Sequence, residues 1–169
     1  ARQMNRQLII DHIPRLRRYA RALVGDRYAA DDLVQDTMER AWNKFHLWRP
    51  GSDLRAWLFA IMHNVFVNQV RRRRNEIEQA MEEPPVVAVR ATQSDQLELQ
   101  DVDRALRLLS EEQREVMLLI AIEQMTYYEV SQALDIPIGT VMSRLSRARD
   151  RLRQLLSGQS SVVALKAVK

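Results

Sequence analysis

The chain has 169 residues, enough for one domain or for two small ones. Glycine and proline are scarce, at 4 and 5 residues, so the composition favours helices. The absence of cysteine excludes disulfides, thiol catalysis and cysteine-ligated zinc, and it fits a cytoplasmic protein. The longest apolar run, from Val116 to Ile122, is too short to span a bilayer, and no signal-peptide pattern opens the chain. We therefore expect no membrane insertion.

Charge is unevenly distributed along the chain, although the net charge is only +4. Arginines fill positions 71–74 without interruption, and five more occur between residues 144 and 153. Between these stretches, residues 95–129 hold nine acidic side chains against three arginines. Two basic zones on either side of an acidic one indicate two separate contacts with a polyanion; solvated helix faces are the alternative explanation.

The first half of the sequence predicts three helices, over residues 6–24, 30–46 and 54–74. Gly25 and Asp26 end the first of them. The predicted buried stripe of the second consists of Leu33, Met38, Ala41, Trp42 and Phe45.

Another face of the second predicted helix is acidic. Asp32, Asp36 and Glu39 fall together on it, and Asp31 and Asp32 are expected in or before the first turn, where carboxylates complement the helix dipole. This face is either solvated or a docking face for a basic partner.

A turn-rich connector precedes the third predicted helix, with the sequence Trp48-Arg49-Pro50-Gly51-Ser52-Asp53. Ser52 or Asp53 can cap the helix. Along the helix runs a polar stripe: Asn64, Asn68, Arg71 and Arg72. Single-stranded DNA needs this mixture, because cations neutralise its backbone while amides and planar groups bind unstacked bases. Aromatic residues stand close by, but we expect Trp57 and Phe66 to be buried in the core.

The strongest functional signal lies between residues 126 and 153. Thr126 to Glu129 form a capping box, as Ser110 to Gln113 do earlier in the chain. A turn at residues 135–137 follows, and a longer basic helix then runs to about residue 156. A short capped helix, a tight turn and a basic helix make a helix-turn-helix, which places the start of its second helix in the major groove of DNA. The residues expected to face DNA there are Thr140, Met142, Ser143, Arg144 and Arg147.

No set of catalytic residues can be assembled from the sequence. His12, His46 and His63 are scattered without metal-ligand spacing. Neither a glycine-rich phosphate loop nor a nucleophile elbow is present. We therefore expect no enzyme activity, no metal site and no cofactor.

Four motifs resemble, in order, segments of the extracytoplasmic-function (ECF) sigma factors of bacterial RNA polymerase. They are Asp31 to Thr37 with Ala41-Trp42, Leu54 to Ile61 with His63-Asn64, Leu109 to Val116, and Gly139 to Arg149. Together they cover roughly residues 8–156, and their order across a linker is far more specific than any one motif. One departure is Met142, which stands where many members carry a basic residue, so the −35 preference of better-known members cannot be transferred.

The resemblance implies an alternative sigma factor that binds core RNA polymerase and directs promoter-specific transcription initiation. The acidic helix would dock on the polymerase clamp through Asp32, Gln35, Asp36 and Glu39. The connector and third helix would capture the opened −10 element through Trp48, Arg49, Gly51, Ser52, Asp53, Asn64, Asn68, Arg71 and Arg72. The five residues of the helix-turn-helix would read the −35 element as duplex. The family also implies an anti-sigma factor as a partner.

We therefore predict an all-α fold with two small helical domains joined by a flexible linker, the C-terminal one a helix-turn-helix. The expected boundaries are 1–75 for the first domain, 76–95 for the linker, 96–157 for the second domain and 158–169 for a tail. The alternative is a dimeric helix-turn-helix regulator that binds an operator. It explains the second half but not the amide-rich helix 54–74, and it predicts specific duplex binding without polymerase.

Overall fold

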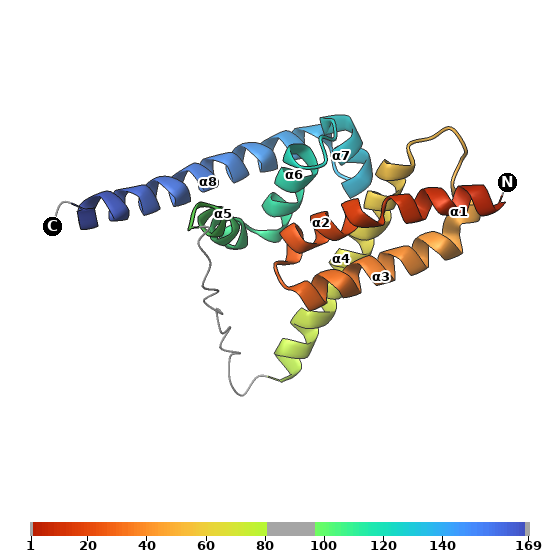
Figure 1. The fold of residues 1–169 in the computed structure, drawn as a ribbon, viewed down its shortest axis with the longest axis horizontal. Coiled ribbons are helices and arrows are strands. Elements are labelled where there is room, and N and C mark those ends of the chain that lie inside the picture. Colours follow the sequence, from red (N-terminus) through yellow and green to blue (C-terminus); the bar gives the residue numbers. More distant parts are fainter. Residues whose placement is uncertain (1, 81–96, 168–169) are drawn as a thin grey trace.

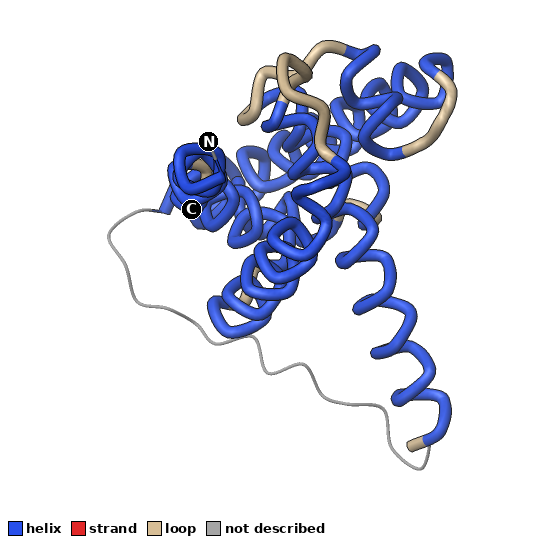
Figure 2. The backbone as a smooth tube through the Cα atoms, turned by 90° about the vertical axis from the view of Figure 1, so that its right-hand side faces the viewer, coloured by secondary structure: helices blue, strands red, loops and turns tan. Residues whose placement is uncertain are grey.

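The computed structural model describes residues 2–80 and 97–167, and their side chains from residue 6 to 80 and from 100 to 158. Every regular element in these ranges is a helix, as predicted (Figure 2). The N-terminal domain contains α1 (Arg2–Asp11), α2 (Ile13–Val24), α3 (Arg27–Lys44), the 3₁₀ helix η1 (Phe45–Leu47) and α4 (Leu54–Gln79). The C-terminal domain contains α5 (Leu97–Leu108), α6 (Glu111–Ala121), α7 (Tyr127–Leu134) and α8 (Ile138–Ala167).

The predicted single helix over residues 6–24 is wrong, because the chain breaks at His12 into α1 and α2. Pro14 lies in the first turn of α2. A proline has no N–H to donate and its ring clashes with the carbonyl four residues earlier, so it interrupts the helix and is favoured in the first turn of a new one. Gly25 ends α2 in the left-handed conformation, with φ +75°, and this part of the prediction is confirmed.

The second predicted helix begins earlier than expected. Asp26 accepts a hydrogen bond from the backbone N–H of Ala29 and so caps α3, which places Asp31 and Asp32 beyond the first turn. Trp42 is 40% exposed rather than buried, and the guanidinium of Arg6 lies 4.4 Å from the centre of its ring. The residues that α3 buries are Ala30, Leu33, Val34, Thr37 and Ala41.

Two helices extend beyond their predicted ends. α4 continues to Gln79, inside the segment expected to be the linker, and residues 81–96 of that segment lie outside the described residues. α8 continues to Ala167, through most of the expected tail. Its far end points away from the N-terminal domain, and the second half of α4 also projects from the body (Figures 1 and 2).

The helix-turn-helix is built by short local contacts. Thr126 and Glu129 form the predicted capping box at the start of α7. Asp135 ends α7 in the left-handed conformation, with φ +53°. The hydroxyl of Ser131 donates to the carbonyl of Ile136 at 2.6 Å, which ties α7 to the turn. These contacts fix the direction in which α8 leaves the turn.

The two domains pack against each other. α4 contacts α7, and α2 contacts α6 (Figure 1). Buried side chains of both domains form one continuous hydrophobic cluster. Within the N-terminal part of it, the rings of Tyr19 and Phe59 meet edge to face with their centres 5.0 Å apart.

Candidate nucleic-acid interface

The start of α8 presents a polar surface beside the start of α6. Four of the five residues predicted to read duplex DNA line one recess there: Thr140, Ser143, Arg144 and Arg147. Spacings of three and four residues put them on one face of the helix. Ser110, the N-cap of α6, and Gln113 of α6 line the same recess, and no local sequence pattern indicated that they would contribute to it.

The two arginines of this surface differ in their surroundings. Arg147 is exposed. The side chain of Arg144 is 26% exposed, and its Nη2 lies 3.6 Å from a carboxylate oxygen of Glu112. Arg147 is therefore the better placed of the two to reach a base or a phosphate.

Met142, the fifth predicted residue, lies on an adjoining face of α8. It is 52% exposed and lines a separate recess with Tyr127 and Arg149. A thioether can contact apolar base edges such as the thymine methyl group, but it cannot donate the bidentate hydrogen bonds that arginine makes to guanine.

The connector before α4 is folded by its own polar groups. Gly51 has φ +93°, which an L side chain rarely adopts. The hydroxyl of Ser52 donates to the carbonyl of Arg49 at 2.6 Å. Asp53 accepts from the backbone N–H groups of Arg55 and Ala56, so it is the N-cap of α4. Arg49, Gly51, Ser52 and Asp53 are all exposed, and nothing lies within 4 Å of the position that a Cβ of Gly51 would occupy.

Aromatic rings support this connector from below. Trp48 stacks on Phe45 with their ring centres 5.5 Å apart, and Phe45 meets Trp57 edge-on at 6.3 Å. Phe66 is buried as predicted, and Trp57 is half-buried. The indole N–H of Trp48 is buried without a hydrogen-bond acceptor in the structure.

The polar stripe on α4 is accessible. Asn64, Asn68, Arg71 and Arg72 are all exposed, at spacings that keep them near one side of the helix. With the connector at its start, α4 therefore offers amide and guanidinium groups over about three turns.

The acidic face of α3 is held by a residue that the sequence analysis did not identify. Gln69 of α4 donates from its amide nitrogen to Asp32 at 3.2 Å and to Asp36 at 2.9 Å. Gln69 is 7% exposed and its carbonyl oxygen has no partner. Gln35 and Glu39 lie beside the two aspartates and are exposed. The only signal for Gln69 in the sequence is its position on the buried side of α4, three residues after Phe66.

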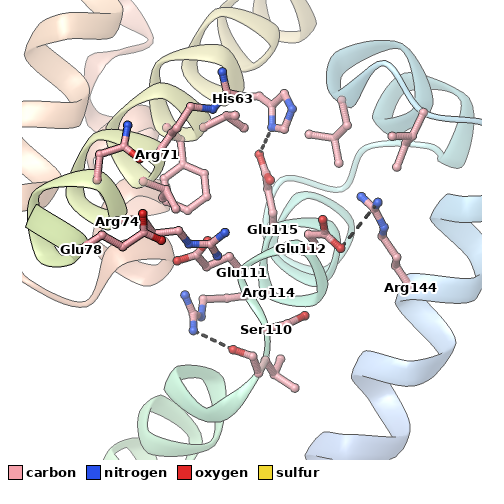
Figure 3. A pocket seen from close by; sticks show the side chains of 17 residues that line it. His63, Arg71, Arg74, Glu78, Ser110, Glu111, Glu112, Arg114, Glu115 and Arg144 are labelled. Carbon is pink, nitrogen blue, oxygen red and sulfur yellow. Dashed lines mark hydrogen bonds and ion pairs between the residues drawn. The ribbon is translucent and has the colours of Figure 1, made fainter. Parts of the chain in front are cut away.

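A cavity of about 810 Å³ separates α4 from the starts of α6 and α8 (Figure 3). Nδ1 of His63 is hydrogen-bonded to Oε1 of Glu115 across it. Burial raises the pKa of Glu115 above its ordinary value, although the hydrogen bond to His63 acts in the opposite direction. Arg71 and Arg144 both line this cavity.

Among the residues that the structure describes, no group of three or more acidic or histidine side chains could hold a metal ion. None of the helices in the described ranges has an apolar stretch of the length a bilayer requires.

Two family models match the chain, one in each domain. Residues 9–63 match the Sigma2 domain of PhyR, and residues 99–152 match region 4 of Sigma-70. The ECF RNA polymerase sigma factor EcfG of Rhodopseudomonas palustris is 36% identical over 88% of this chain and 82% of its own length. The ECF RNA polymerase sigma factor SigE of Mycolicibacterium smegmatis is 33% identical over 95% of this chain and 65% of its own length.

Solved structures agree. Sigma factor RpoE from Bartonella quintana, crystallised with the anti-sigma factor NepR, superposes with a TM-score of 0.78 and 39% identity, covering 89% of this chain and 95% of its own. CnrH, in complex with the cytosolic domain of CnrY, superposes with a TM-score of 0.69 and 29% sequence identity, covering 94% of this chain and 90% of its own length.

A helix-turn-helix beside a second helical domain with an exposed stripe of amides and arginines defines a DNA-binding protein of transcription. The chain belongs to the ECF family of RNA polymerase sigma factors. It is an alternative sigma factor, and the function expected from the sequence motifs is confirmed.

Proposed function

We propose that the exposed polar groups divide promoter recognition between the two domains. The connector 48–53 and the α4 stripe bind the opened −10 strand, and α8 reads the −35 duplex with Arg147 as its leading side chain. Exposure of the whole α4 stripe, ending in the arginine run 71–74, is the observation that carries this assignment. Amides and arginines must be exposed to bind a nucleic acid. When exposed together, amides can bind unstacked bases while arginines neutralise the charged backbone of a single strand.

The acidic face of α3 docks on core polymerase in this proposal. Hydrogen bonds from Gln69 hold the carboxylates of Asp32 and Asp36 in fixed directions, which lowers the entropy that docking must remove. Exposed Gln35 and Glu39 extend the surface. Core polymerase and promoters meet in the cytoplasm, so we place the protein there.

An anti-sigma factor is the expected inhibitor. The relative RpoE was crystallised with the anti-sigma factor NepR, and the structure of CnrH is that of its complex with the cytosolic domain of CnrY. Such a partner would mask the docking face around Asp32 and Asp36, so it and core polymerase would exclude each other. A stable ternary complex with full transcription activity would contradict this.

Run-off transcription tests the assignment. Purified core polymerase and a library of promoters are mixed with the full chain, and the transcripts are sequenced. We expect transcription from a defined set of −35 and −10 sequences only when the chain is present, and weak duplex binding by the chain alone. Tight sequence-specific binding without polymerase would overturn the proposal and favour an operator-binding regulator.

A further inference from the structure

A second recess beside the start of α8 is separate from the arginine surface described above. It lies between α8 and the first residue of α7, two helices that contact each other (Figure 1). Its volume is about 180 Å³, and its lining includes Tyr127, Met142, Leu145, Ser146 and Arg149. A pocket that encloses a whole small molecule measures about 300–1,000 Å³, so this recess suits a single protruding group.

The lining is apolar at the start of α8 and cationic further along the helix. Leu145 is buried, while Met142 and Tyr127 are 52% and 38% exposed. Ser146 and Arg149 are exposed and follow Met142 at spacings of four and three residues. These spacings place the three side chains in one stripe of α8.

This order of side chains complements a DNA duplex. The start of the second helix of a helix-turn-helix enters the major groove, so Met142 and Tyr127 face base edges when α8 docks. Arg149 lies seven residues after Met142, about 10 Å along the helix, where a phosphate of the groove wall comes within reach. It makes no ion pair with any residue that the structure describes, whereas Arg153, further along the same recess, is paired with Asp150 at 3.5 Å.

Thymine is the base whose edge fits this lining. Its C5 methyl group is the only methyl group that the base pairs present in the major groove, beside their hydrogen-bond donors and acceptors. The thioether of Met142 is at most a weak acceptor, so a donor or acceptor buried against it loses a hydrogen bond to water. A methyl group loses none, and its burial is favourable. An arginine at position 142 would select guanine instead, through two hydrogen bonds.

We propose that Tyr127 and Met142 form a pocket that selects a thymine of the −35 element through its C5 methyl group, and that Arg149 fixes the register by binding a phosphate nearby. This inference rests on the proposed assignment of α8 to the −35 duplex. It adds a residue of α7 to the reading surface and makes one base position independent of Arg147. Selection at that position is apolar, so salt leaves it unchanged, whereas the contribution of Arg149 falls as salt is raised.

The test replaces each thymine of the preferred −35 duplex, on either strand, by deoxyuridine, which differs only in lacking the methyl group. Fluorescence anisotropy measures the affinity of the holoenzyme assembled from core polymerase and the full chain. Burial of one methyl group contributes about fourfold to a binding constant, so we expect about a fourfold loss at one position. The same replacement should have no effect in Met142→Ala, and Met142→Leu should retain the loss because leucine keeps an apolar contact.

Two further variants separate the parts of the pocket. Tyr127→Ala should reduce the effect of the missing methyl group, and Tyr128→Ala is the matched control, because this neighbouring tyrosine is exposed and does not line the recess. Arg149→Ala should weaken binding to all −35 sequences evenly and lower the slope of log affinity against log salt by about one. The effect of deoxyuridine should be the same in Arg149→Ala as in the wild type. Circular dichroism verifies that each variant folds.

Three results would overturn the thymine pocket. They are a preferred −35 element without thymine on either strand, no loss of affinity at any deoxyuridine position, and an undiminished loss in Met142→Ala. Each of them leaves the proposed function intact, because run-off transcription has by then defined a −35 preference. A chain that shows no −35 preference in run-off transcription would instead refute the assignment of α8 and, with it, this inference.

Discussion

Arg107 on α5 donates a hydrogen bond of 2.9 Å to the carbonyl of Leu23, which lies 84 positions earlier at the end of α2. A second bond reaches the carbonyl of Ala22, and Arg114 donates to Leu23 at 3.1 Å. The last carbonyls of a helix have no partner within it and carry its negative pole, so arginines from another domain satisfy both needs.

Gly25→Ala tests this contact. Gly25 has φ +75°, and a Cβ there would lie 2.7 Å from Nη1 of Arg107. We expect a loss of about 1–3 kcal/mol in the free energy of unfolding, since a left-handed alanine is strained and the guanidinium must move. Urea denaturation of Gly25→Ala, Arg107→Ala and the double variant measures it. Because the two residues share one contact, the double variant should lose less than the two single losses added together. Strictly additive losses would show that the guanidinium does not respond to Gly25.

Two variants of Asp53 distinguish its capping of α4 from a possible second role in selecting a −10 base. Asp53→Ala removes the N-cap of α4 and should cost about 1 kcal/mol, whereas Asp53→Ser keeps a capping oxygen and should cost little. If the carboxylate also selects a −10 base, Asp53→Ser should keep the wild-type Tm and alter the −10 preference in run-off transcription. Wild-type preference in Asp53→Ser would restrict the residue to capping.

Arg147 should contribute more to −35 recognition than Arg144. Arg147→Ala should cost about 1–3 kcal/mol on the preferred −35 duplex and relax the preference at one position, provided that the side chain reaches a base edge. Arg144→Ala should cost less, because Glu112 already engages that guanidinium. Arg151→Ala, one turn beyond Arg147 and also exposed, is the matched control. The measurement is the affinity of the assembled holoenzyme for single-base variants; wild-type affinity and preference in Arg147→Ala would disprove the docking.

The buried carboxyl of Glu115 predicts a pH dependence of stability. Burial raises its pKa in the folded chain above the ordinary value of 4.5, so the folded state binds this proton more readily than the unfolded state. The resulting stabilisation is fully present below pH 4.5 and is lost as the pH rises through the raised pKa. In Glu115→Gln the free energy of unfolding should therefore fall less over this range than in the wild type. Denaturation curves at several pH values check this, with the exposed Glu112→Gln as control; equal slopes in wild type and Glu115→Gln would refute it.

Gln69 is expected to position the docking face on α3. Gln69→Leu removes the amide that binds Asp32 and Asp36, and should weaken binding to core polymerase by about threefold to tenfold, which corresponds to the roughly 0.5–1.5 kcal/mol of a typical hydrogen bond. Binding of single-stranded DNA should not change. Because leucine suits a 7% exposed site, stability should be nearly preserved. If Gln69→Asn binds core polymerase as the wild type does, the amide group positions the two carboxylates. If Gln69→Leu binds core polymerase as the wild type does, the amide has no such role.

The sequence rules for helix ends correctly predicted those helix boundaries that are formed by contacts between neighbouring residues. Gly25, Asp53, Ser110 and Thr126 were all expected at helix ends, and each lies there, because caps involve residues only a few positions apart. Periodicity was less reliable. Trp42 was expected in the core, but α3 buries Ala30, Leu33, Val34, Thr37 and Ala41 and leaves the indole at the surface.

Contacts between the domains had no signal in the sequence. Nothing near Glu111 indicates Arg74, and nothing near Gln69 indicates Asp36, since each pair joins separate helices. The sequence showed that residues 95–129 are rich in acidic side chains. Only the three-dimensional structure identifies the basic side chains that these acids contact. For the same reason, the sequence predicted an exposed Arg144 but could not predict its contact with Glu112.

All three tryptophans lie between residues 42 and 57, and the C-terminal domain has none. Trp48 and Trp57 share the aromatic cluster under the connector, while Trp42 lies under Arg6 on α3. The tryptophan emission of the chain, excited at wavelengths that tyrosine does not absorb, therefore arises entirely from the regions assigned to the −10 element and to polymerase. A base that stacks near Trp48 would quench this light, whereas a duplex held by the helix-turn-helix alone would leave it unchanged. The unlabelled protein thus carries an optical probe that distinguishes its two DNA contacts.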